Sequence, residues 1–424
     1  VLDVEGVDPT ITDEMVTLWT FTWLDAMQAA TARVPIFYSY RNFIASRYLQ
    51  DAPTVEKFRN YHLWLAQPGN PADPAVQVGT PVATLYDYDQ DWIYEIGLTP
   101  NRMDAMSHFG VAKDVCAYLT YHANKAEPIS PLNQTPTINA AMEPMDVVIE
   151  NPEGCARYSG ILIEGVKVGP SPAWLKNKLQ SIGARSINNI VDITNFILHE
   201  TGQPLHAFDA AKIQGKKVVV KKCAPNSLFT SLDEKERKLT AEDLMICDIE
   251  KPMCIAGVFG GLHSGVSAST SSIFLESAWF ENVHIRKTSV HHGLRTDAAT
   301  RFEKGVDIAN TVKVLEKAAA MIQEIAGGTC SKVVDVYPNP AEKVKVSMTF
   351  AYLKKLSGKQ YASDKAVAIL TSLGFEILHQ DAESIQVAVP YNKPDISIAA
   401  DLVEEILRID GLDNIEIPTA ITIS

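Results

Sequence analysis

Apolar residues recur along the chain at two spacings, and each spacing predicts one kind of element. Short runs rich in β-branched and aromatic residues predict strands in ARYSGILIEGV (156–166), KVVVKKC (217–223) and SIFLESAW (272–279). Apolar residues at helical spacing predict helices in SPAWLKNKLQSIG (171–183) and ANTVKVLEKAAAMIQEIAGG (309–328). Their alternation predicts a mixed α/β domain over residues 146–340, and no Gly-rich phosphate loop follows a strand there, which argues against a doubly wound sheet.

The flanking segments have patterns of their own. In TPNRMDAMSHFGVAKDVCAYL (99–119) the positions of Met106, Val111, Val115 and Tyr118 predict one amphipathic helix packed on its neighbours through these side chains. Residues 341–424 predict the order strand, helix, helix, strand, strand, helix. The first two helices, in TFAYLKKLSG and SDKAVAILTSLG, suit a helix-turn-helix in which each helix ends in a glycine C-cap.

Linkers divide the chain into four segments. A Pro/Gly-rich stretch, QPGNPADPAV (67–76), ends a first segment in which WLDAMQAATA and VPIFYSY suit a βα pattern. The prediction is a multidomain α+β protein, in which a mixed α/β domain is flanked by smaller helix-rich domains. The expected segments are 1–74, 75–145, 146–340 and 341–424.

Composition narrows the classes of function. The formal net charge of −13 disfavours a nucleic-acid partner unless cations gather locally. Candidates for such a patch are KNK at 176–178 and KK at 216–217 and 221–222, and the alternative is that these are ordinary solvated faces. Six cysteines lack the spacing of a zinc site or a disulfide framework. No apolar run reaches the roughly 20 residues of a membrane helix, and the first residues show no secretory leader. We therefore expect no membrane association and a cytoplasmic location.

Three polar residues stand out in ARSINNIVDITNFILHETGQPLHAFD (184–209). Thr194 and Asn195 interrupt an apolar stretch, and a Gly-Gln-Pro turn then presents His206. A histidine there can act as a base or orient a water molecule, because its pKa lies near neutrality. The alternative is a histidine that only bonds the backbone of its loop.

Two further features suggest a pocket. Gly257, Gly260 and Gly261 in AGVFGGLHSGV permit close backbone approach or positive φ. Glu276 lies in an otherwise apolar strand, where an ionised carboxylate is costly without a partner. Facing a pocket it could select for a ligand hydroxyl; the alternative is a structural ion pair.

Four carboxylates near the end of the chain form a candidate cation site. Asp401, Glu404 and Glu405 are spaced i, i+3 and i+4, which places them on one helical face, and Asp395 precedes them. Oxygen ligands suit Mg²⁺, but a solvated acidic face gives the same pattern.

Taken together, VDITNFILHETGQPLHAFD, AGVFGGLHSGV, FLESAWF, HHGLRTDAATRFEKGVD and ADLVEEILRIDGLDNI resemble, in order and spacing, motifs of the bacterial phenylalanyl-tRNA synthetase β subunit. The resemblance runs from about residue 75 to 424, and its 146–340 counterpart is an editing domain that hydrolyses tyrosine wrongly joined to the phenylalanine tRNA. An apolar synthetic pocket rejects an added hydroxyl only modestly, so a second site that recognises this hydroxyl gives the missing specificity.

The resemblance assigns roles to these residues. Glu276 would accept the tyrosine hydroxyl, and His206, Thr194 and Asn195 would hold the ester and the attacking water. Gly260 and Gly261 would form the pocket wall, while Thr296 and Ala298 would leave room for the ring. Asp395, Asp401, Glu404 and Glu405 would bind Mg²⁺ in a site shared with the α subunit.

The resemblance also implies partners. These are the α subunit, which uses ATP and with which the family forms a heterotetramer, and tRNA(Phe). Part of the family's N-terminal domain, its RNA-binding insertion and its C-terminal domains are not represented. A non-catalytic module for assembly and tRNA binding therefore stays open beside the editing hydrolase.

The first 74 residues do not fit this family. VLDVEG, WLDAMQAA, RVPIFYSYRNF and YHLWLAQPG are similar to part of a lysozyme-like muramidase, whose acidic pair would correspond to Asp3 and Glu5. Paired carboxylates suit glycoside hydrolysis, so a glycosidase is a remote third alternative.

Overall fold

The structure is a computed structural model, and it describes residues 2–3, 36–40, 62–66, 81–87, 92–123 and 130–415. Side chains are described from residue 96 onward within these ranges. The chain divides into two compact units, Val1–Gly79 and Thr80–Ser424.

Three parallel strands make up the described part of the first unit. They are β1 (Leu2–Asp3), β2 (Ile36–Tyr40) and β3 (His62–Ala66), in the order β1-β2-β3. β2 confirms the strand expected in VPIFYSY. The helix expected at 23–32 and Glu5 of the muramidase-like pair lie outside the described residues, and for Asp3 only the backbone is described.

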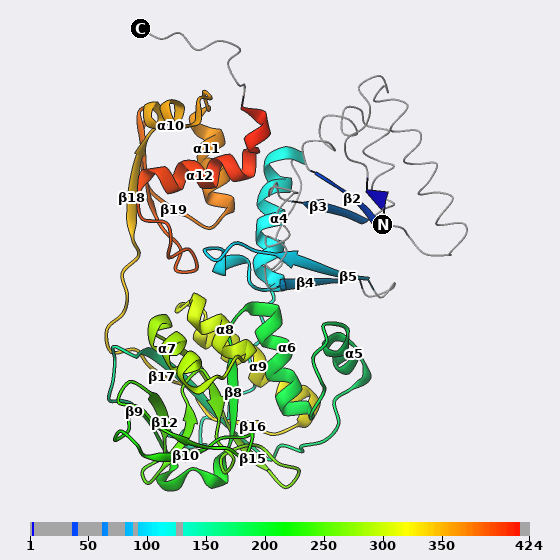
Figure 1. Cartoon of the computed structure of the whole chain (residues 1–424), viewed down its shortest axis with the longest axis vertical. Coiled ribbons are helices and arrows are strands. Elements are labelled where there is room, and N and C mark those ends of the chain that lie inside the picture. Colours follow the sequence, from blue (N-terminus) through cyan, green and yellow to red (C-terminus); the bar gives the residue numbers. More distant parts are fainter. Residues whose placement is uncertain are drawn as a thin grey trace, which may run out of the picture. The chain divides into compact units, whose positions relative to one another are not determined.

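The second unit contains several sheets and the helices that cover them (Figure 1). Its strands are β4 (Pro81–Asp87), β5 (Trp92–Gly97), β6 (Asp146–Ile149), β7 (Cys155–Glu164), β8 (Leu205–Asp209), β9 (Lys217–Lys222), β10 (Leu228–Thr230), β11 (Glu236–Lys238), β12 (Leu244–Cys247), β13 (Pro252–Ile255), β14 (Phe259–Gly260), β15 (Ser272–Phe280), β16 (Thr329–Cys330), β17 (Val334–Val336), β18 (Lys345–Thr349), β19 (Glu376–Gln380) and β20 (Ser384–Ala388). Its helices are α4 (His108–Ala123), α5 (Ala173–Ser181), α6 (Asn189–Thr201), α7 (Asn282–His292), α8 (Asp297–Lys304), α9 (Thr311–Ala326), α10 (Phe350–Ser357), α11 (Ser363–Ser372) and α12 (Ala399–Asp410). Short 3-10 turns are η2 (Met103–Ala105), η3 (Ala210–Lys212), η4 (Gln214–Lys216) and η5 (Leu412–Asn414).

Two sheets form the centre of residues 146–340. One has the order β16-β7-β15-β8, with β17 also paired to β7, and all of these pairs are antiparallel. The other has the order β14-β13-β12-β9-β6, in which only β6 and β9 run parallel. The α+β class is therefore confirmed, and the largely antiparallel pairing agrees with the expectation that the domain is not doubly wound.

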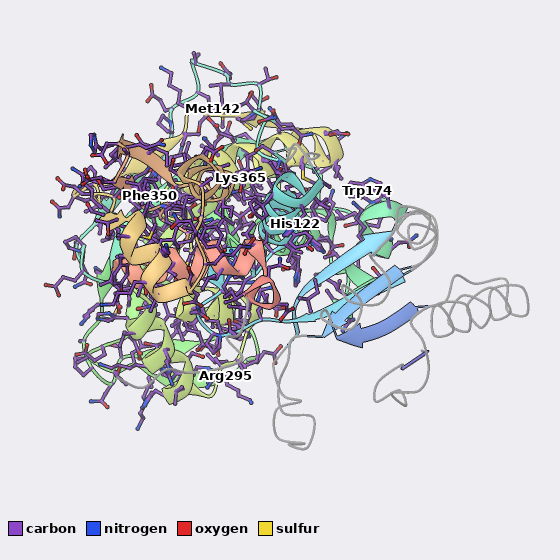
Figure 2. All side chains as sticks on the ribbon, turned by 90° about the horizontal axis from the view of Figure 1, so that it is seen from above. His122, Met142, Trp174, Arg295, Phe350 and Lys365 are labelled. Atoms are coloured by element: carbon purple, nitrogen blue, oxygen red, sulfur yellow. The ribbon has the colours of Figure 1, made fainter. Side chains whose placement is uncertain are left out.

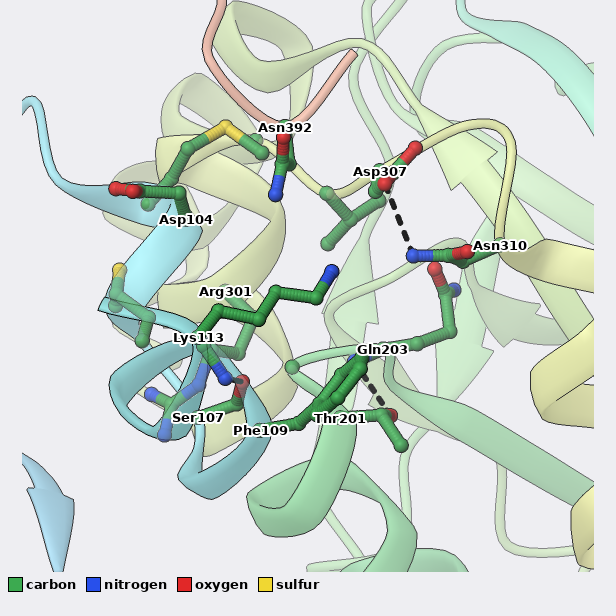
Figure 3. A pocket seen from close by; sticks show the side chains of 16 residues that line it. Asp104, Ser107, Phe109, Lys113, Thr201, Gln203, Arg301, Asp307, Asn310 and Asn392 are labelled. Atoms are coloured by element: carbon green, nitrogen blue, oxygen red, sulfur yellow. Dashed lines mark hydrogen bonds between the residues drawn. The ribbon is translucent and has the colours of Figure 1, made fainter. Parts of the chain in front are cut away.

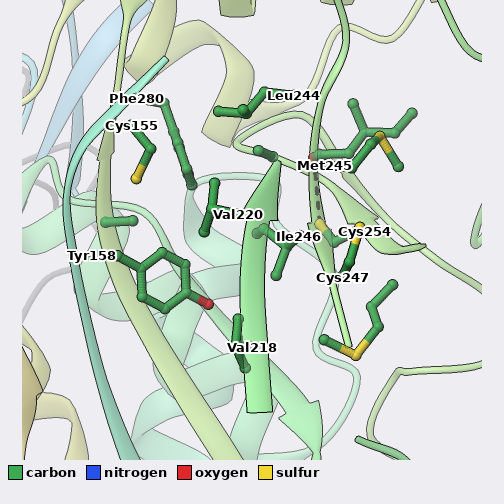
Figure 4. Packing of buried hydrophobic residues seen from close by; sticks show 14 of the residues in the cluster. Cys155, Tyr158, Val218, Val220, Leu244, Met245, Ile246, Cys247, Cys254 and Phe280 are labelled. Carbon is green, nitrogen blue, oxygen red and sulfur yellow. Dashed lines mark hydrogen bonds between the residues drawn. The ribbon is translucent and has the colours of Figure 1, made fainter. Parts of the chain in front are cut away.

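Alternate side chains of β7 and β15 enter different cores, because successive residues of a strand point to opposite faces. Tyr158 and Phe274 face the core shared with the second sheet, where Val218, Val220 and Ile246 pack (Figure 4). The alternate residues of the two strands, including Ile161 and Leu275, face a second core built with α5, α6 and α9. The long sheet is thus covered on both faces, which explains the near-continuous apolar run of β15.

Residues 345–410 show the order of elements expected from the sequence. A three-stranded antiparallel sheet, β18-β20-β19, packs with α10, α11 and α12. α10 ends at Gly358 with φ 75°, as a glycine C-cap requires. α11 ends at Ser372, its C-cap is Leu373, and the expected glycine, Gly374, follows the cap with φ 89°.

The packed face expected for α4 was wrong in part. Val111 is buried as expected, but Val115 is 46% exposed and Met106 precedes the helix. The inner face is formed instead by Gly110, Val111 and Ala117. Small residues fit there because a Cβ at Gly110 would lie 2.0 Å from the backbone oxygen of Asp104.

Among the described helices, none combines the length and apolar character needed to cross a membrane.

Candidate functional site

A tight turn positions the segment that carries His206. α6 ends at Gly202, whose φ of 82° reverses the chain. The next residue, Gln203, is 2% exposed, and its Nε2 donates to the backbone oxygen of Ala278 on β15 at 2.8 Å. This bond attaches the turn to the sheet just before β8 begins. His206 therefore lies on a strand, and its position is fixed by the ladder rather than by a loop.

His206 and Glu276 lie directly opposite each other in the β8–β15 ladder. Opposed residues of an antiparallel pair project from the same face, with Cβ atoms about 5 Å apart. β8 is an edge strand, so this pair lies at the margin of the sheet. The sequence separation of the two motifs gave no hint of this contact, but the structure brings them together as the resemblance implies.

The carboxyl of Glu276 is buried and bonded to a phenol. Tyr158 Oη donates to Glu276 Oε2 at 2.6 Å, and Tyr158 itself is fully buried. Burial raises the pKa of Glu276 to about 8, although the Tyr158 hydrogen bond acts in the opposite direction. Glu276 is therefore mostly protonated at neutral pH. The alternative of a structural ion pair is not what the structure shows, since the partner is a neutral hydroxyl.

The His206 imidazole is held neutral by its surroundings. Its ring meets Phe208 edge to face, with centroids 4.4 Å apart. Nε2 is enclosed and, within the part of the chain that the structure describes, has no hydrogen-bond partner. Burial lowers the pKa of His206 to about 4. The alternative of a histidine bonded to its loop backbone is not supported, and the enclosed ring nitrogen is neutral and without a partner among the described residues.

The two predicted wall glycines have different neighbours. A Cβ at Gly260 would lie 3.1 Å from His206 Cε1 and 2.8 Å from Leu232 Cδ1. A Cβ at Gly261 would instead meet the backbone oxygen of Met253 at 2.5 Å and the Phe229 ring. Gly260 thus borders the histidine, whereas Gly261 allows close packing of the core.

Thr194 and Asn195 are both on α6, but no hydrogen bond among the described residues joins either of them to His206. The Thr194 hydroxyl donates to the backbone oxygen of Val191 at 2.7 Å. The apolar side of α6, including Ile193 and Ile197, packs in the core on the sheet face opposite Glu276. The structure therefore places these two residues in the neighbouring helix without joining them to the strand pair.

Thr296 and Ala298 lie at the start of α8. The Thr296 hydroxyl caps the helix by accepting from the Ala299 N–H at 3.0 Å, and it donates to the backbone oxygen of Val258 at 2.9 Å. This second bond ties α8 to the loop that leads into β14. The role of Thr296 seen here is to hold that loop, and Ala298 follows on the half-buried side of the first turn.

A cavity of about 40 Å³ lies beside the Gly-Gln-Pro turn (Figure 3). Lys113 extends into it, and Asp307 and Asn310 bond each other on its wall at 2.9 Å. Gln203 contributes to the lining with an Oε1 that has no partner in the described part of the chain. Neither His206 nor Glu276 borders this cavity, so it is distinct from the predicted site.

The four carboxylates expected to hold Mg²⁺ do not converge. Glu405 is buried and paired with Lys393 Nζ and Arg408 Nη2, each at 2.9 Å. Asp401 accepts from the backbone N–H groups of Ser397 and Ile398, which caps α12. Glu404 and Asp395 are exposed, and Asp395 accepts from Asn101 at 3.1 Å.

This arrangement does not fit a magnesium site. Over residues 96–123 and 130–415, no three His, Cys, Asp or Glu side chains are grouped as metal ligands would be. The expectation of one helical face failed because Glu405 turns inward to two cations from the same unit, while Glu404 faces solvent.

Two residues of the site were missed in the sequence. Tyr158 bonds Glu276, and Gln203 anchors the turn to β15. Gln203 lies within the Gly-Gln-Pro motif and could have been suspected as a turn anchor. Tyr158 had no local signal, because its relation to Glu276 depends on the pairing of strands more than 100 residues apart, with |i−j| of 118.

Comparisons with known proteins agree with this architecture. Residues 154–327 match the family described as the B3/4 domain, and residues 346–412 match the tRNA synthetase B5 domain. The phenylalanine–tRNA ligase beta subunit of Bacteroides fragilis (strain YCH46) is 45% identical over 344 residues, which cover 81% of this chain and 42% of that protein. The protein of the same name from Porphyromonas gingivalis is 45% identical over 343 residues, with 80% and 42% covered.

A solved structure is also similar in part. It is an N-terminal fragment of the phenylalanyl-tRNA synthetase β subunit from Pyrococcus horikoshii, with 16% identity and a TM-score of 0.38, covering 73% of this chain and 84% of that one. A TM-score of this size supports no transfer of geometry.

The B3/4 and B5 domains place the chain in the class of aminoacyl-tRNA synthetase subunits. It spans about 42% of the length of the curated relatives it matches. Within that class, the chain belongs to the family of phenylalanine–tRNA ligase beta subunits.

Proposed function

We propose that the chain hydrolyses tyrosine from wrongly charged Tyr-tRNA(Phe). The observation that carries the proposal is the opposition of His206 and Glu276 on β8 and β15, because it places a hydroxyl-binding group and a neutral imidazole on one face. A buried carboxyl can distinguish tyrosine from phenylalanine, since a site built to bond a hydroxyl is left unpaired when the ligand lacks it.

Glu276 and His206 have different proposed roles in ester hydrolysis. The tyrosine that is esterified to the tRNA would direct its phenol to Glu276. Its ester group would lie near the enclosed Nε2 of His206. His206 would orient the attacking water and accept its proton, which suits a neutral ring. The water oxygen bonds to the carbonyl carbon, the bond to the ribose oxygen breaks, and that oxygen takes up the proton. The products are free tyrosine and tRNA(Phe).

Other parts of the proposal come from the family. The α subunit would supply the synthetic site that uses ATP, and this chain would contribute to a heterotetramer with it in the cytoplasm. Thr194, Asn195, Thr296 and Ala298 are proposed to complete the pocket when the ester is bound, and Gly260 is proposed as its wall beside His206. The arrangement of Asp395, Asp401, Glu404 and Glu405 gives no support to Mg²⁺ binding by this chain.

One observation favours a second candidate function, a non-catalytic module for assembly and tRNA binding. The carboxyl of Glu276 is already bonded by Tyr158, so its hydroxyl-binding position has an internal occupant. In this alternative the pair of His206 and Glu276 has only a structural role in the sheet.

Release of tyrosine from Tyr-tRNA(Phe) by the purified chain separates the two candidates. Phe-tRNA(Phe) is the substrate control, and Glu276→Ala is compared with Glu383→Ala, which removes an exposed carboxylate from residues 345–410. Editing predicts release of tyrosine but not phenylalanine, abolished by Glu276→Ala and retained by Glu383→Ala. No release at high protein concentration would contradict editing by this chain and leave assembly as its function.

A further inference from the structure

The segment from residue 165 to 191 differs in charge from the rest of the chain. It contains Lys167, Lys176, Lys178 and Arg185 and no Asp or Glu, within a chain whose net charge is −13. The next acid, Asp192, is buried, and its carboxylate accepts from the Ser171 and Ser186 hydroxyls. The charged side chains of this segment are therefore all cations.

An exposed tryptophan lies within this cationic segment. The inner side of α5 packs through Leu175 and Leu179, which are buried. On its outer side Trp174 is 41% exposed, and Figure 2 shows it at the margin of the described side chains. The indole is therefore partly open to solvent on a helix whose inner side is well packed.

Two side chains contact the Trp174 ring. It meets Phe196 of α6 edge to face, with centroids 5.7 Å apart. Lys178 Nζ lies 5.6 Å from the Trp174 centroid and 5.1 Å from that of Phe196. Glu200, whose charge acts on Lys178, is paired with the buried Lys317. The ring is thus fixed in orientation, and this acid is already neutralised.

We propose that Trp174, with Lys176, Lys178 and Arg185, binds single-stranded RNA through base stacking and phosphate contacts. A fixed aromatic face beside cations is the combination that single-stranded nucleic acids require, because every base has a π-face and every link carries a charge. A duplex offers phosphates but no free base for the ring. In a chain with a net charge of −13, a segment with four cations and no acid also concentrates the attraction for a polyanion at this one place.

This surface would bind the tRNA that is the substrate of the proposed function. The identification of the RNA as tRNA rests on that proposed function. Phe196 follows directly after Asn195 on α6, so the strand would lie beside the helix that carries two predicted site residues. The unpaired aminoacylated end of a tRNA is the segment whose ester must reach His206. Because α5 packs on the sheet face opposite His206, its surface would bind nucleotides further along the strand and not those next to the ester.

The test measures binding of the full chain to a single-stranded RNA of about eight nucleotides and to a hairpin of equal length, by fluorescence anisotropy over a range of salt concentrations. Trp174→Ala should weaken binding of the single strand by about 10-fold or more, because one stacked base contributes that much. Trp174→Phe should retain most of the affinity. The salt dependence should change little in either variant.

A double variant, Lys176→Gln with Arg185→Gln, tests the phosphate contacts. It should reduce the slope of log K against log salt by about 1.4, since each single-strand phosphate contact contributes about 0.7. The matched control, Lys354→Gln with Lys355→Gln, removes the same charge from α10 and should leave the slope nearly unchanged. Equal loss in both double variants, or unchanged binding in Trp174→Ala, would overturn the proposal.

Ester release measured on the same proteins keeps the two proposals separate. Glu276→Ala should bind the oligonucleotide normally while it releases no tyrosine. Release that depends on Glu276, together with RNA binding that is indifferent to Trp174, would reject the surface and keep the editing function. Binding that depends on Trp174 in a chain that releases no tyrosine would keep the RNA-binding surface and reject the editing function.

Discussion

Tyr158 donates its phenol hydrogen to Glu276 Oε2 across 2.6 Å, in the interior of the long antiparallel sheet. The contact joins a tyrosine hydroxyl to the residue that the proposed function assigns to a substrate tyrosine hydroxyl. The fold therefore contains, within its own core, an example of the recognition it is proposed to perform. It also explains how a carboxyl can remain buried in an apolar strand, since it has a partner that needs no charge.

Tyr158→Phe should lower the free energy of unfolding by about 1–3 kcal/mol, because it leaves the buried Glu276 carboxyl without this donor. Urea unfolding followed by circular dichroism measures the change. Tyr352→Phe, at an exposed position of α10, is the matched control and should have little effect. Equal stability of the two variants would show that the 2.6 Å bond contributes nothing to folding.

Glu276 should make stability fall as pH rises. Its pKa of about 8 in the folded chain exceeds the ordinary value of 4.5, so between these values the folded state keeps a proton that the unfolded state has lost. The penalty is absent below about pH 4.5 and complete above about pH 8, with a size on the order of 5 kcal/mol. Glu276→Gln removes the titration, so the stability of the variant relative to the parent should increase from pH 5 to pH 8. A constant difference over that range would contradict the raised pKa.

His206 should act in the opposite direction and over a lower range. Its pKa is lowered from 6.5 to about 4, so below pH 6.5 the unfolded state takes up a proton that the folded state refuses. Stability is therefore lost as pH falls from 6.5 to about 4, by up to roughly 3 kcal/mol. His206→Gln should abolish this loss, whereas His379→Gln, at an exposed position, should not. A parent and His206→Gln variant that lose stability in parallel would reject the prediction.

Sequence patterns predicted the elements better than the contacts between them. The strands containing Tyr158 and Glu276 and the helix of residues 311–326 followed from local spacing, because burial on both faces of a sheet or on one face of a helix leaves a repeating pattern. The pairing of His206 with Glu276 was implied by the family resemblance and by nothing in either segment alone.

The acidic cluster shows why contacts over long sequence distances were not predictable. Spacing placed Glu404 and Glu405 on one side of α12, but their environments differ because Lys393 reaches Glu405 and not Glu404. Lys393 in turn bonds Asp104, which is 289 residues away along the chain. Helical periodicity contains no information on such a partner.

Lys393→Met should be strongly destabilising. Lys393 is 4% exposed and joins Asp104 at 2.7 Å to Glu405 at 2.9 Å, so its loss leaves two carboxylates short of a cation. Removing one partner of a buried ion pair costs about 3–5 kcal/mol. Lys343→Met breaks the exposed pair with Glu376 and should cost less than about 1 kcal/mol. Thermal unfolding of both variants at one pH measures the contrast, and similar melting temperatures would argue that the network is not a stabilising contact.

Gly260→Ala and Gly261→Ala should separate an effect on the site from an effect on folding. At Gly260 the new methyl would press on the far ends of Leu232 and the His206 ring, which can shift by a few tenths of an ångström at modest cost. At Gly261 it would lie 2.5 Å from the backbone oxygen of Met253, which cannot move without disturbing the sheet. We expect Gly261→Ala to lower the melting temperature the more, and Gly260→Ala to stay folded while tyrosine release slows by at least about 10-fold, as a displaced catalytic group implies. Circular dichroism melting and the release assay on the same two proteins check both parts. Full release by a folded Gly260→Ala variant would remove Gly260 from the proposed pocket wall.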